Sequence, residues 1–520
     1  MKRDFAALCG RQFDLLVCGG GIYGAWTAYD AALRGLQVAI VEQGDWAGAT
    51  SSASSKLIHG GLRYLESFDF RLVRKSLRER ERLLRVAPHC VWPLRFGVPV
   101  YADSRIGTLR LAAGLTIYDF LAHDPDPDMA HRHFRRDEFT RHFPVLDAAG
   151  LKGGFTYADA QIDDARLVLE LVSGAIEAGA VCVNYCRLDG APEFNGSVYK
   201  ATVQDQLDHT RAEIHARQIV NATGQWTAQT VEARNWCRLT KGVHLVLPGT
   251  SCDEALLLTA RSDGRVFFII PWYGRSLLGT TDTDYGGDLD RVSVEAADIA
   301  YLLAEANHYL KTGWTEADVI GSYAGLRVLM NSGKTAPSAA SRDWELKTAR
   351  NGVHYSIGGK MTSSREDASH IVDTVCAQLG VPVPSRTQEQ AFPWAPQQDF
   401  SAWCIAMNAQ ATRLGVDAES AKWLLRRHGK RVGEIFLLLG ADPELAVRIT
   451  PALPLIYADL VWSARHEMAV HLGDLLRRRM PLLILAKPDA SELQRLAEMI
   501  APAMGWDAAR IAQEIETCRA

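Results

Sequence analysis

Long apolar runs are absent from this sequence. Nowhere do about 18 consecutive apolar residues occur, the length that a membrane-spanning helix requires. Residues 1–13 lack an apolar stretch followed by a small-residue cleavage site, so we expect no signal peptide. These absences argue against a helical membrane protein but leave binding at a membrane surface open.

Cysteine pairs at metal-ligand spacing are also missing. The ten cysteines are scattered, and the nearest pair, Cys182 and Cys186, lies in an apolar run that resembles a strand. We therefore expect reduced thiols and a cytoplasmic protein rather than a disulfide framework. His131 and His133 have no second ligand pair at metal spacing, so we predict no metal.

Excess positive charge is lacking as well. The net charge of -4 argues against a general nucleic-acid-binding protein. The length of 520 residues is too great for one compact core, so we expect more than one domain.

A βαβ unit is predicted near the N-terminus. Residues 13–18 form a short β-rich run, residues 22–34 form a helical stretch of small residues, and residues 38–41 form a second strand. Gly35 is placed to end the helix. The unit spans about 30 residues, the length that such a crossover needs.

The remaining elements indicate two kinds of sheet and a helical tail. We predict a helix over 165–179 and a hairpin over 197–216. Further strands are predicted over 181–188, 218–221, 243–247, 266–270 and 276–279. Pro and Gln gather over 381–398 as in a linker, and the tail beyond is helical in pattern. We therefore predict two domains, 1–388 and 389–520.

The glycine pattern Gly19-x-Gly21-x-x-Gly24 lies between the first strand and the first helix. In a dinucleotide site the first glycine permits the turn, the second admits the pyrophosphate and the third lets helix and strand pack closely. Glu42 ends the second strand, where a carboxylate can accept hydrogen bonds from ribose hydroxyls. The pattern predicts a dinucleotide, although a ligand-free glycine turn has the same appearance.

Residues 49–65 are rich in serine, threonine and glycine and directly follow the strand that ends at Glu42. A flexible linker has this composition, but the position favours hydroxyl contacts with a cofactor. Residues 50–65 resemble the signature of FAD-dependent glycerol-3-phosphate dehydrogenases, within the glycine-oxidase-like flavoproteins. Further stretches similar to that family are 158–167, 221–226, 241–244, 270–272, 279–282, 358–362 and 465–468.

The resemblance implies an α/β fold in which a Rossmann-type FAD-binding domain is interleaved with an antiparallel substrate-capping sheet, followed by an all-α domain. It implies oxidation of sn-glycerol 3-phosphate to dihydroxyacetone phosphate, electron transfer to a quinone, and a homodimer. The glycine turn and the resemblance together assign these residues to FAD: Gly19, Gly21, Ile22, Gly24, Glu42, Gln43, Thr50, Ser51, Ser52, Ser55, Lys56, Leu57, His59, Gly60, Gly61, Ala222, Gly224, Trp226, Gly359, Lys360, Met361 and Thr362.

Cationic side chains are expected around the substrate because a phosphate dianion needs them, and arginine offers a planar fork that suits phosphate. The substrate-binding candidates are Arg63, Tyr64, Thr281, Arg327, Arg342 and Lys360. Arg63, Arg327 and Lys360 are also catalytic candidates, and His244 is the candidate base for the hydroxyl proton. Each arginine could instead be an ordinary surface charge, and His244 could have a purely structural role.

Two departures from the family pattern lie near these candidates: Val328 replaces a proline and Ser364 replaces an aromatic residue. A related polyol phosphate or phosphonate therefore stays open as the substrate. An amine oxidase of the same superfamily and a non-catalytic flavin-binding regulator are also compatible with the sequence.

Charged stretches outside the motifs have two interpretations. The helical pattern over 69–86 is typical of a solvated face with ion pairs four residues apart. The basic clusters 426–431 and 477–479 could equally be solvated helix faces or a surface for anionic lipid heads.

Overall fold

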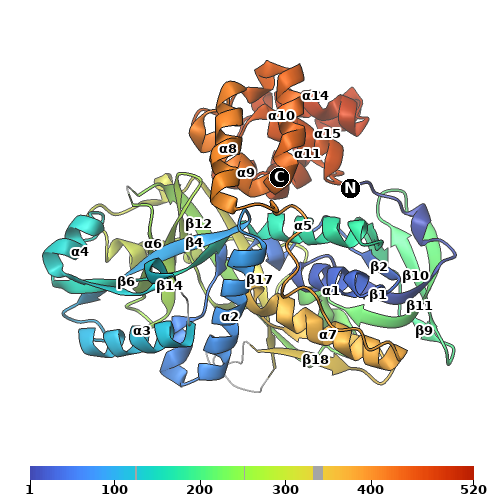
Figure 1. Cartoon of the computed structure of the whole chain (residues 1–520), viewed down its shortest axis with the longest axis horizontal. Helices are drawn as coiled ribbons and strands as arrows, with labels where there is room; N and C mark the ends of the chain where they lie inside the picture. The colour runs from blue at the N-terminus through green and yellow to red at the C-terminus, as the bar shows by residue number, and fades with distance from the viewer. Residues whose placement is uncertain (123–125, 251, 332–342, 520) are drawn as a thin grey trace.

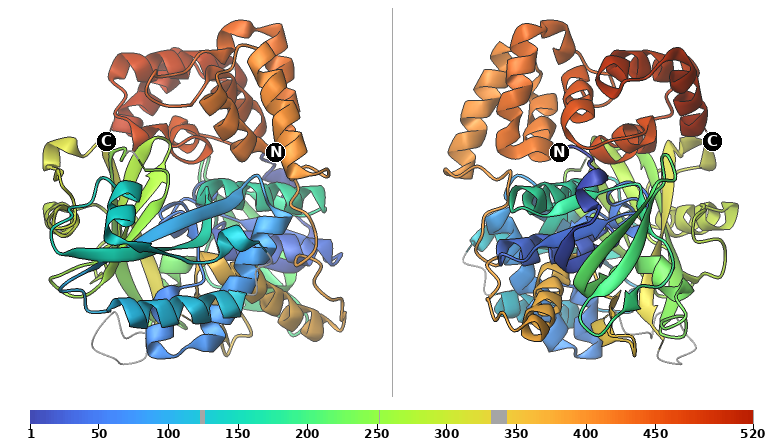
Figure 2. Two further views of the ribbon diagram at one scale, coloured as in Figure 1. Left: turned by 60° about the vertical axis from the view of Figure 1, so that its left-hand side comes forward. Right: turned by 90° about the vertical axis from the view of Figure 1, so that its right-hand side faces the viewer.

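The structure is a computed structural model that describes residues 1–122, 126–250, 252–331 and 343–519, without the side chains of Arg63 and Ser67. Two lobes, each built on one sheet, lie side by side, and a set of C-terminal helices covers them from one end (Figure 1). Figure 2 shows the same helical cap over both lobes from two further directions.

The first lobe contains the predicted parallel sheet, with strand order β18-β19-β11-β1-β2-β7. β1 pairs in parallel with both β2 and β11, as the glycine-turn prediction requires, and of the described strands along this path only β18 runs antiparallel. The strands are β1 (Gln12–Cys18), β2 (Val38–Val41), β7 (Val181–Val183), β8 (Cys186–Leu188), β9 (Glu193–Phe194), β10 (Tyr199–Asp205), β11 (Arg211–Asn221), β18 (Trp344–Thr348) and β19 (His354–Gly358).

Alternation along β1 gives this sheet two buried faces. Leu15 and Val17 pack with the helices α1 (Ile22–Leu33), α5 (Asp164–Glu177) and α7 (Ser364–Leu379). Leu16 and Cys18 face the other way and share a core with side chains of β10 and β11.

The predicted strands 13–18 and 38–41, the helices 22–34 and 165–179 and the hairpin are confirmed within a few residues, and β11 continues through the strand predicted over 218–221. The single strand predicted over 181–188 is wrong. The chain breaks there into β7, which pairs with β2, and β8, which pairs with β10, because Tyr185 between them has a positive φ of 49°.

The second lobe is a mostly antiparallel sheet of order β16-β12-β15-β14-β13-β4-β6-β3, with β17 beside β12 and β5 beside β6. Its strands include those predicted over 243–247, 266–270 and 276–279, which are parts of β12, β14 and β15. The strands of this sheet are β3 (Leu57–Ile58), β4 (Val91–Tyr101), β5 (Arg132–Arg135), β6 (Leu151–Ile162), β12 (Cys237–Pro248), β13 (Ala255–Thr259), β14 (Val266–Trp272), β15 (Arg275–Gly279), β16 (Thr283–Asp284) and β17 (Gly321–Met330). The predicted fold class is confirmed.

Helices cover the second sheet. α4 (Arg136–His142) and α6 (Ala296–Asn307) share a core with β12, β14 and β15. α2 (Phe70–Val86) and α3 (Thr108–Ala122) share another with β4 and β6.

The charged helix α2 is not simply a solvated face. Arg71, Arg74 and Arg78 are exposed, as predicted. Glu79 and Arg80, however, are buried. Glu79 pairs with Arg365 on α7, and Arg80 pairs with Asp159 on β6. An isolated buried charge is very costly, so each of these residues needs its partner.

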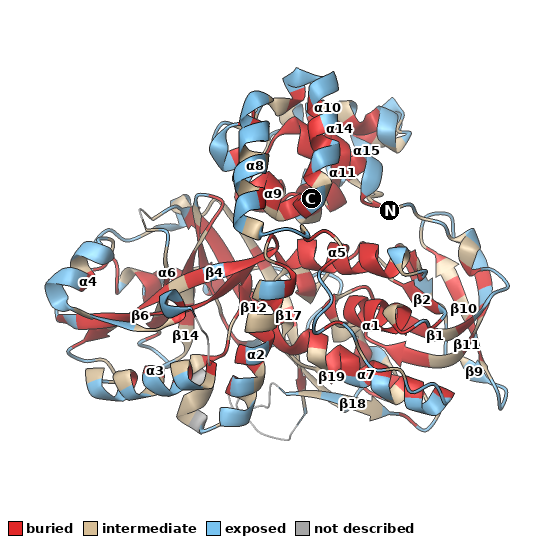
Figure 3. Cartoon of the chain, viewed as in Figure 1, coloured by how far each residue is buried: buried red, intermediate tan, exposed pale blue. Residues whose placement is uncertain are grey.

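No helix or strand lies between the end of α7 at Leu379 and the start of α8, where the linker was predicted. The tail beyond is helical, and its helices are exposed on their outer sides and buried where they meet the lobes (Figure 3). They are α8 (Phe400–Arg413), α9 (Ala418–His428), α10 (Val432–Ala441), α11 (Tyr457–His466), α12 (Leu472–Asp474), the π-helical turn η11 (Leu475–Arg479), α13 (Leu482–Leu485), α14 (Ala490–Met504) and α15 (Ala508–Arg519).

The helical domain is docked by buried charges as well as by apolar contacts. Arg166 on α5 binds Glu467 through two hydrogen bonds of 2.6 and 2.8 Å. Trp423 stacks on Tyr273 with ring centroids 3.6 Å apart. Of the described helices, none is long and apolar enough to cross a bilayer.

The two basic clusters of the tail belong mostly to this interface. Arg427 and Arg479 are buried in ion pairs with Asp459 and Asp45. Arg431 lies over the rings of Trp394 and Trp462, at 4.0 and 4.2 Å. Arg427, Arg431 and Arg479 therefore form neither of the two surfaces that the sequence left open, a solvated helix face or a lipid-facing surface, because their side chains are enclosed by these contacts.

Candidate active site

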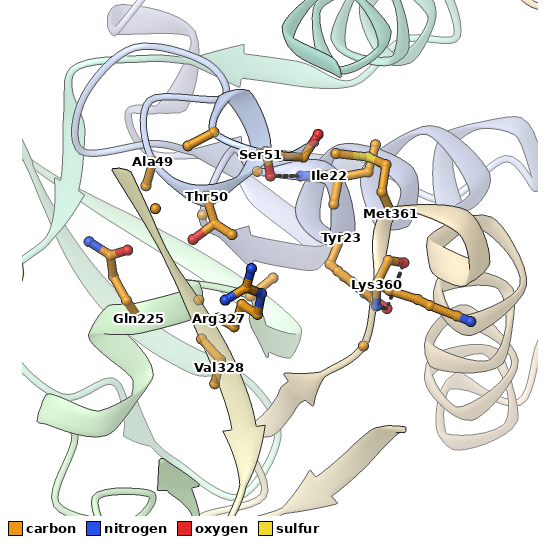
Figure 4. Close-up of a pocket in the computed structure, with 18 of the residues that line it drawn as sticks. Ile22, Tyr23, Ala49, Thr50, Ser51, Gln225, Arg327, Val328, Lys360 and Met361 are labelled. Carbon is orange, nitrogen blue, oxygen red and sulfur yellow. Dashed lines mark hydrogen bonds between the residues drawn. The ribbon is translucent and has the colours of Figure 1, made fainter. Parts of the chain in front are cut away.

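A cavity of about 1230 Å³ lies between the two lobes. Pockets for ordinary small ligands measure roughly 300–1,000 Å³, so this one has room for more than a small substrate. The wall includes the ends of β1 and β2, the turn η2 (Thr50–Ser52), η5 (Gly224–Gln229), β12, β17 and residues 358–362. Figure 4 shows part of this wall, with Arg327 and Val328 on β17.

The turn from β1 into α1 admits no side chain at two of its glycines. A Cβ on Gly19 would lie 2.5 Å from the carbonyl oxygen of Ala222, and one on Gly24 would lie 1.8 Å from that of Gly19. Ser51 closes the turn from the other side by accepting a hydrogen bond of 2.9 Å from the Ile22 amide (Figure 4). The first residues of α1 line the cavity, where their dipole and amide groups suit a pyrophosphate.

Glu42 lies at the end of β2, in the wall of the cavity. Its carboxylate accepts hydrogen bonds from the amides of Gly20 (2.6 Å) and Gly44 (2.9 Å). Burial raises the pKa of this carboxyl, and the two amide bonds oppose that effect. These bonds fix both oxygens at the cavity edge, where ribose hydroxyls can meet them.

Most residues assigned to the cofactor do line this cavity. They are Gly19, Gly21, Ile22, Glu42, Gln43, Thr50, Ser51, Ser55, Leu57, His59, Gly61, Ala222, Gly224, Trp226, Gly359, Lys360, Met361 and Thr362. Gly24, Ser52, Lys56 and Gly60 are not among the lining residues. The ammonium of Lys56 instead binds Asp164 at 2.6 Å and the carbonyl of Ser52 at 2.7 Å, so it anchors the loop from behind.

The capping sheet brings Arg327 and Thr281 to the cavity. Arg327 donates hydrogen bonds to the Thr281 carbonyl (3.1 Å) and the Thr280 hydroxyl (2.9 Å), and pairs with Asp282 at 3.3 Å. Arg265 also lines the cavity and binds the Asp282 carbonyl at 2.7 Å. Two guanidinium groups therefore flank one turn after β15. No local pattern in the sequence points to Arg265, because its position depends on how β14 pairs with β15.

His244 lies on β12 and contacts the end of the 50–55 loop. Its Nε2 is 2.9 Å from the Ser55 hydroxyl, and its ring stacks on Tyr323 with centroids 4.9 Å apart. Burial lowers the pKa of His244 well below its usual value, and the charges of Arg327 and Lys56 add to the effect. His244 is therefore neutral at neutral pH, and the same burial and charges make it a weak base.

Lys360 and Tyr64 form a second group of candidates, apart from Arg327. The Lys360 ammonium points away from Arg327 (Figure 4), donates to Ser76 at 2.5 Å and lies 4.9 Å from the centre of the Tyr64 ring. Burial lowers the pKa of Lys360 to about 8. Arg63 lies next to Tyr64 in the turn η3 (Leu62–Ser67), but its side chain is outside the described part of the structure, as is the whole of Arg342.

Comparison with known proteins agrees with this geometry. Residues 14–365 match the family described as FAD dependent oxidoreductase, and residues 395–511 match the C-terminal domain of alpha-glycerophosphate oxidase. The chain is thus an FAD-dependent oxidoreductase. The glycine turn fits that cofactor because it has no side chains that would keep a pyrophosphate away from the backbone. The carboxylate of Glu42 fits it because it can meet the ribose hydroxyls.

Its relatives narrow the family further. A glycerol-3-phosphate dehydrogenase of Synechocystis is 36% identical over 99% of this chain and 97% of its own. The aerobic enzyme of Bacillus subtilis is 32% identical over 90% of this chain and 87% of its own. A crystal structure of the Bacillus halodurans enzyme with FAD superposes with a TM-score of 0.80 at 28% identity, covering 98% of this chain and 95% of that one. The chain belongs to the glycerol-3-phosphate dehydrogenase family.

Proposed function

We propose that this enzyme oxidises sn-glycerol 3-phosphate to dihydroxyacetone phosphate and passes the electrons from FAD to a quinone. The observation that carries the proposal is the pair of cationic groups around one cavity: Arg327 with Arg265 on the cap, and Lys360 beside Tyr64. A substrate with a phosphate at one end and a reacting alcohol at the other needs positive charge at both places.

The two cationic groups have different roles in this proposal. Arg327 binds the Thr280 hydroxyl at 2.9 Å, and the preceding residue, Gly279, pairs with His244 between β15 and β12. Arg327 thus lies on the same part of the wall as the base and suits the oxygen on C2. The Lys360 ammonium points away from Arg327 (Figure 4) and lies beside the Tyr64 ring. These two residues suit the phosphate, together with the predicted Arg63 and Arg342. Thr281 fixes the cap, because its hydroxyl accepts a hydrogen bond of 3.1 Å from the amide of Val243.

His244 takes the proton of the substrate hydroxyl at Nε2, the nitrogen that contacts Ser55. Bound FAD supplies the acceptor for the hydride that leaves C2. Arg327 stabilises the negative charge that develops on the C2 oxygen as that proton leaves.

Turnover with a soluble dye acceptor tests the reaction. We expect oxidation of sn-glycerol 3-phosphate, slower reaction when C2 carries deuterium, and no measurable reaction with glycerol, which lacks the phosphate. Equal turnover of glycerol would contradict the phosphate-anchor argument.

D-erythritol 1-phosphate is the second candidate substrate. A D-erythritol 1-phosphate dehydrogenase of Brucella abortus is 37% identical over 80% of this chain and 88% of its own. Val328, which replaces the expected proline, lines the cavity directly after Arg327. The ratio of kcat/KM for the two phosphates decides between them.

We propose that the enzyme contacts an anionic bilayer through an exposed apolar patch. At the bilayer the enzyme would meet its quinone acceptor. Phe68 and Phe70 form a ring pair next to α3, and the outer side of α3 carries Leu109 and Phe120. Leu109 and Phe120 are 88% and 79% exposed. The patch lies at the end of the molecule opposite the C-terminal helices (Figure 1). Exposed arginines border it at Arg71, Arg74 and Arg110, as expected of a surface that meets anionic lipids.

Flotation with anionic vesicles tests this surface. The double variant Phe68→Ser, Phe120→Ser should lose vesicle binding and keep turnover with the soluble dye. Ile405→Ser is the matched control, because Ile405 is 72% exposed on α8 in the helical domain. Unchanged flotation of the double variant would rule out the patch.

A further inference from the structure

The helical domain reaches the dinucleotide end of the cavity through one side chain. Arg478, in the turn η11, lines the cavity together with Glu42, Gln43, Gly44 and Asp45. These four residues belong to the loop that leaves β2. The end of the cavity that suits a ribose and its base is therefore built by two domains.

Asp45 joins the two domains at this point. Its carboxylate accepts a hydrogen bond of 2.6 Å from Nε of Arg478 and one of 2.9 Å from Arg479, which also contacts it through the other guanidinium nitrogen. Arg479 in turn donates to the Glu467 carbonyl at 2.8 Å. The side chains of Asp45 and Arg479 are both fully buried. Removing one partner of such a pair leaves an uncompensated buried charge.

The strand end beside this loop is tied to the same helices. Tyr185 donates its amide to the Gly44 carbonyl at 2.8 Å and its hydroxyl to Asp474 at 2.7 Å. Asn184 donates to the Met468 carbonyl at 3.0 Å. The 42–45 loop and the residues just before Cys186, where the next lining segment begins, are thus both held by residues 467–479, more than 280 positions further along the chain.

We propose that the helical domain completes the FAD site, with Arg478 and Arg479 as positioning residues that hold the 42–45 loop in its binding shape through Asp45. Docking of the helical domain and binding of FAD then stabilise each other, because each favours the same loop arrangement. Such a linkage is reciprocal. If docking of the helical domain strengthens FAD binding by a certain factor, binding of FAD strengthens docking by the same factor.

FAD affinity of the full-length chain tests the first direction. We expect Arg478→Met and Asp45→Asn to bind FAD at least ~10-fold more weakly than the unchanged protein when the apoprotein is reconstituted, with partial recovery in Arg478→Lys. The rise in Tm on adding FAD should shrink in both weakened variants. A merely structural role would lower the Tm of apo and FAD-bound protein alike and leave that rise unchanged. Arg477→Met is the control, because Arg477 is exposed in the same turn.

Proteolysis of the unaltered protein tests the other direction and needs no variant that could misfold. FAD should slow cleavage within residues 381–398, which carry no helix or strand, at least several-fold relative to the apoprotein. Equal cleavage with and without FAD, or unchanged FAD affinity in Asp45→Asn and Arg478→Met, would overturn the proposal. No substrate is present in these experiments, so they stand apart from the test of the reaction.

Discussion

Cationic side chains lie at two places on the wall of the cavity. Arg327 and Arg265 meet at Asp282, whereas Lys360 lies over Tyr64 on another part of the wall. Sequence motifs pointed to Arg327 and Lys360, and both line the cavity. They could not locate Arg265, or show that Lys56 faces Asp164, because both depend on strand pairing and on partners far along the chain.

Arg327→Met should lower kcat by roughly 10²–10³, the usual cost of losing one donor to a developing oxyanion. The flavin-to-protein ratio should stay unchanged. Steady-state kinetics with the soluble dye gives the first quantity, and the visible spectrum gives the second. Arg132→Met, at a half-exposed arginine on β5, serves as the control. A normal kcat in Arg327→Met would remove Arg327 from the reacting centre.

The pH dependence of KM tests Lys360. Burial lowers its pKa to about 8, so the ammonium loses its proton as the pH rises through that value. If this cation binds the phosphate, KM for glycerol 3-phosphate should rise above pH 8 and be steady between pH 7 and 8, where the phosphate stays a dianion. Lys360→Met should have a high KM at every pH. A KM of the unchanged enzyme that stays level from pH 7 to 9.5 would contradict this role.

At the scale of elements, the β1-turn-α1 unit was predictable almost residue by residue, since glycine spacing and strand ends are local signals. The basic clusters of the tail were not. Arg427 and Arg479 lie in runs of basic residues, a pattern typical of an exposed helix face. Their side chains are buried because they pair with Asp459 and Asp45. Local patterns in the sequence cannot reveal a partner that lies on another element.

Gly24→Ala should abolish FAD binding or folding, because the added Cβ would lie 1.8 Å from a backbone oxygen that cannot yield. The flavin content of the purified protein measures this. Gly114→Ala in α3 is the matched control, because nothing lies within 4 Å of its added Cβ. That variant should bind FAD normally and be about as stable or slightly more stable. Full flavin content in Gly24→Ala would contradict the close packing of turn and helix.

For the whole molecule, the interface between α5 and the C-terminal helices joins the cofactor lobe to the tail. Burial raises the pKa of the Glu467 carboxyl, but the charge and hydrogen bonds of Arg166 lower it more. The pKa therefore lies well below its usual value. A carboxyl with a lowered pKa stabilises the fold above its unfolded pKa and loses that contribution only as the pH falls through the folded value. The pair should therefore hold through mild acid.

Glu467→Gln should destabilise the protein by about 3–5 kcal/mol at neutral pH, because it leaves Arg166 buried without its charge partner. Thermal unfolding gives the size of the effect. Glu498→Gln, on an exposed part of α14, should change the Tm little. Equal Tm values for Glu467→Gln and the unchanged protein would mean that this interface does not depend on the pair.

The homodimer and the cytoplasmic location, which also concern the whole molecule, stay predictions.

The reaction is tested most directly by the visible spectrum of the purified enzyme during anaerobic titration with sn-glycerol 3-phosphate. A glycerol-3-phosphate dehydrogenase of the proposed kind should show an oxidised flavin spectrum that bleaches as the substrate is added, and no bleaching with glycerol. A flavin that stays oxidised with glycerol 3-phosphate but bleaches with D-erythritol 1-phosphate would contradict the proposed substrate and identify the longer polyol phosphate in its place.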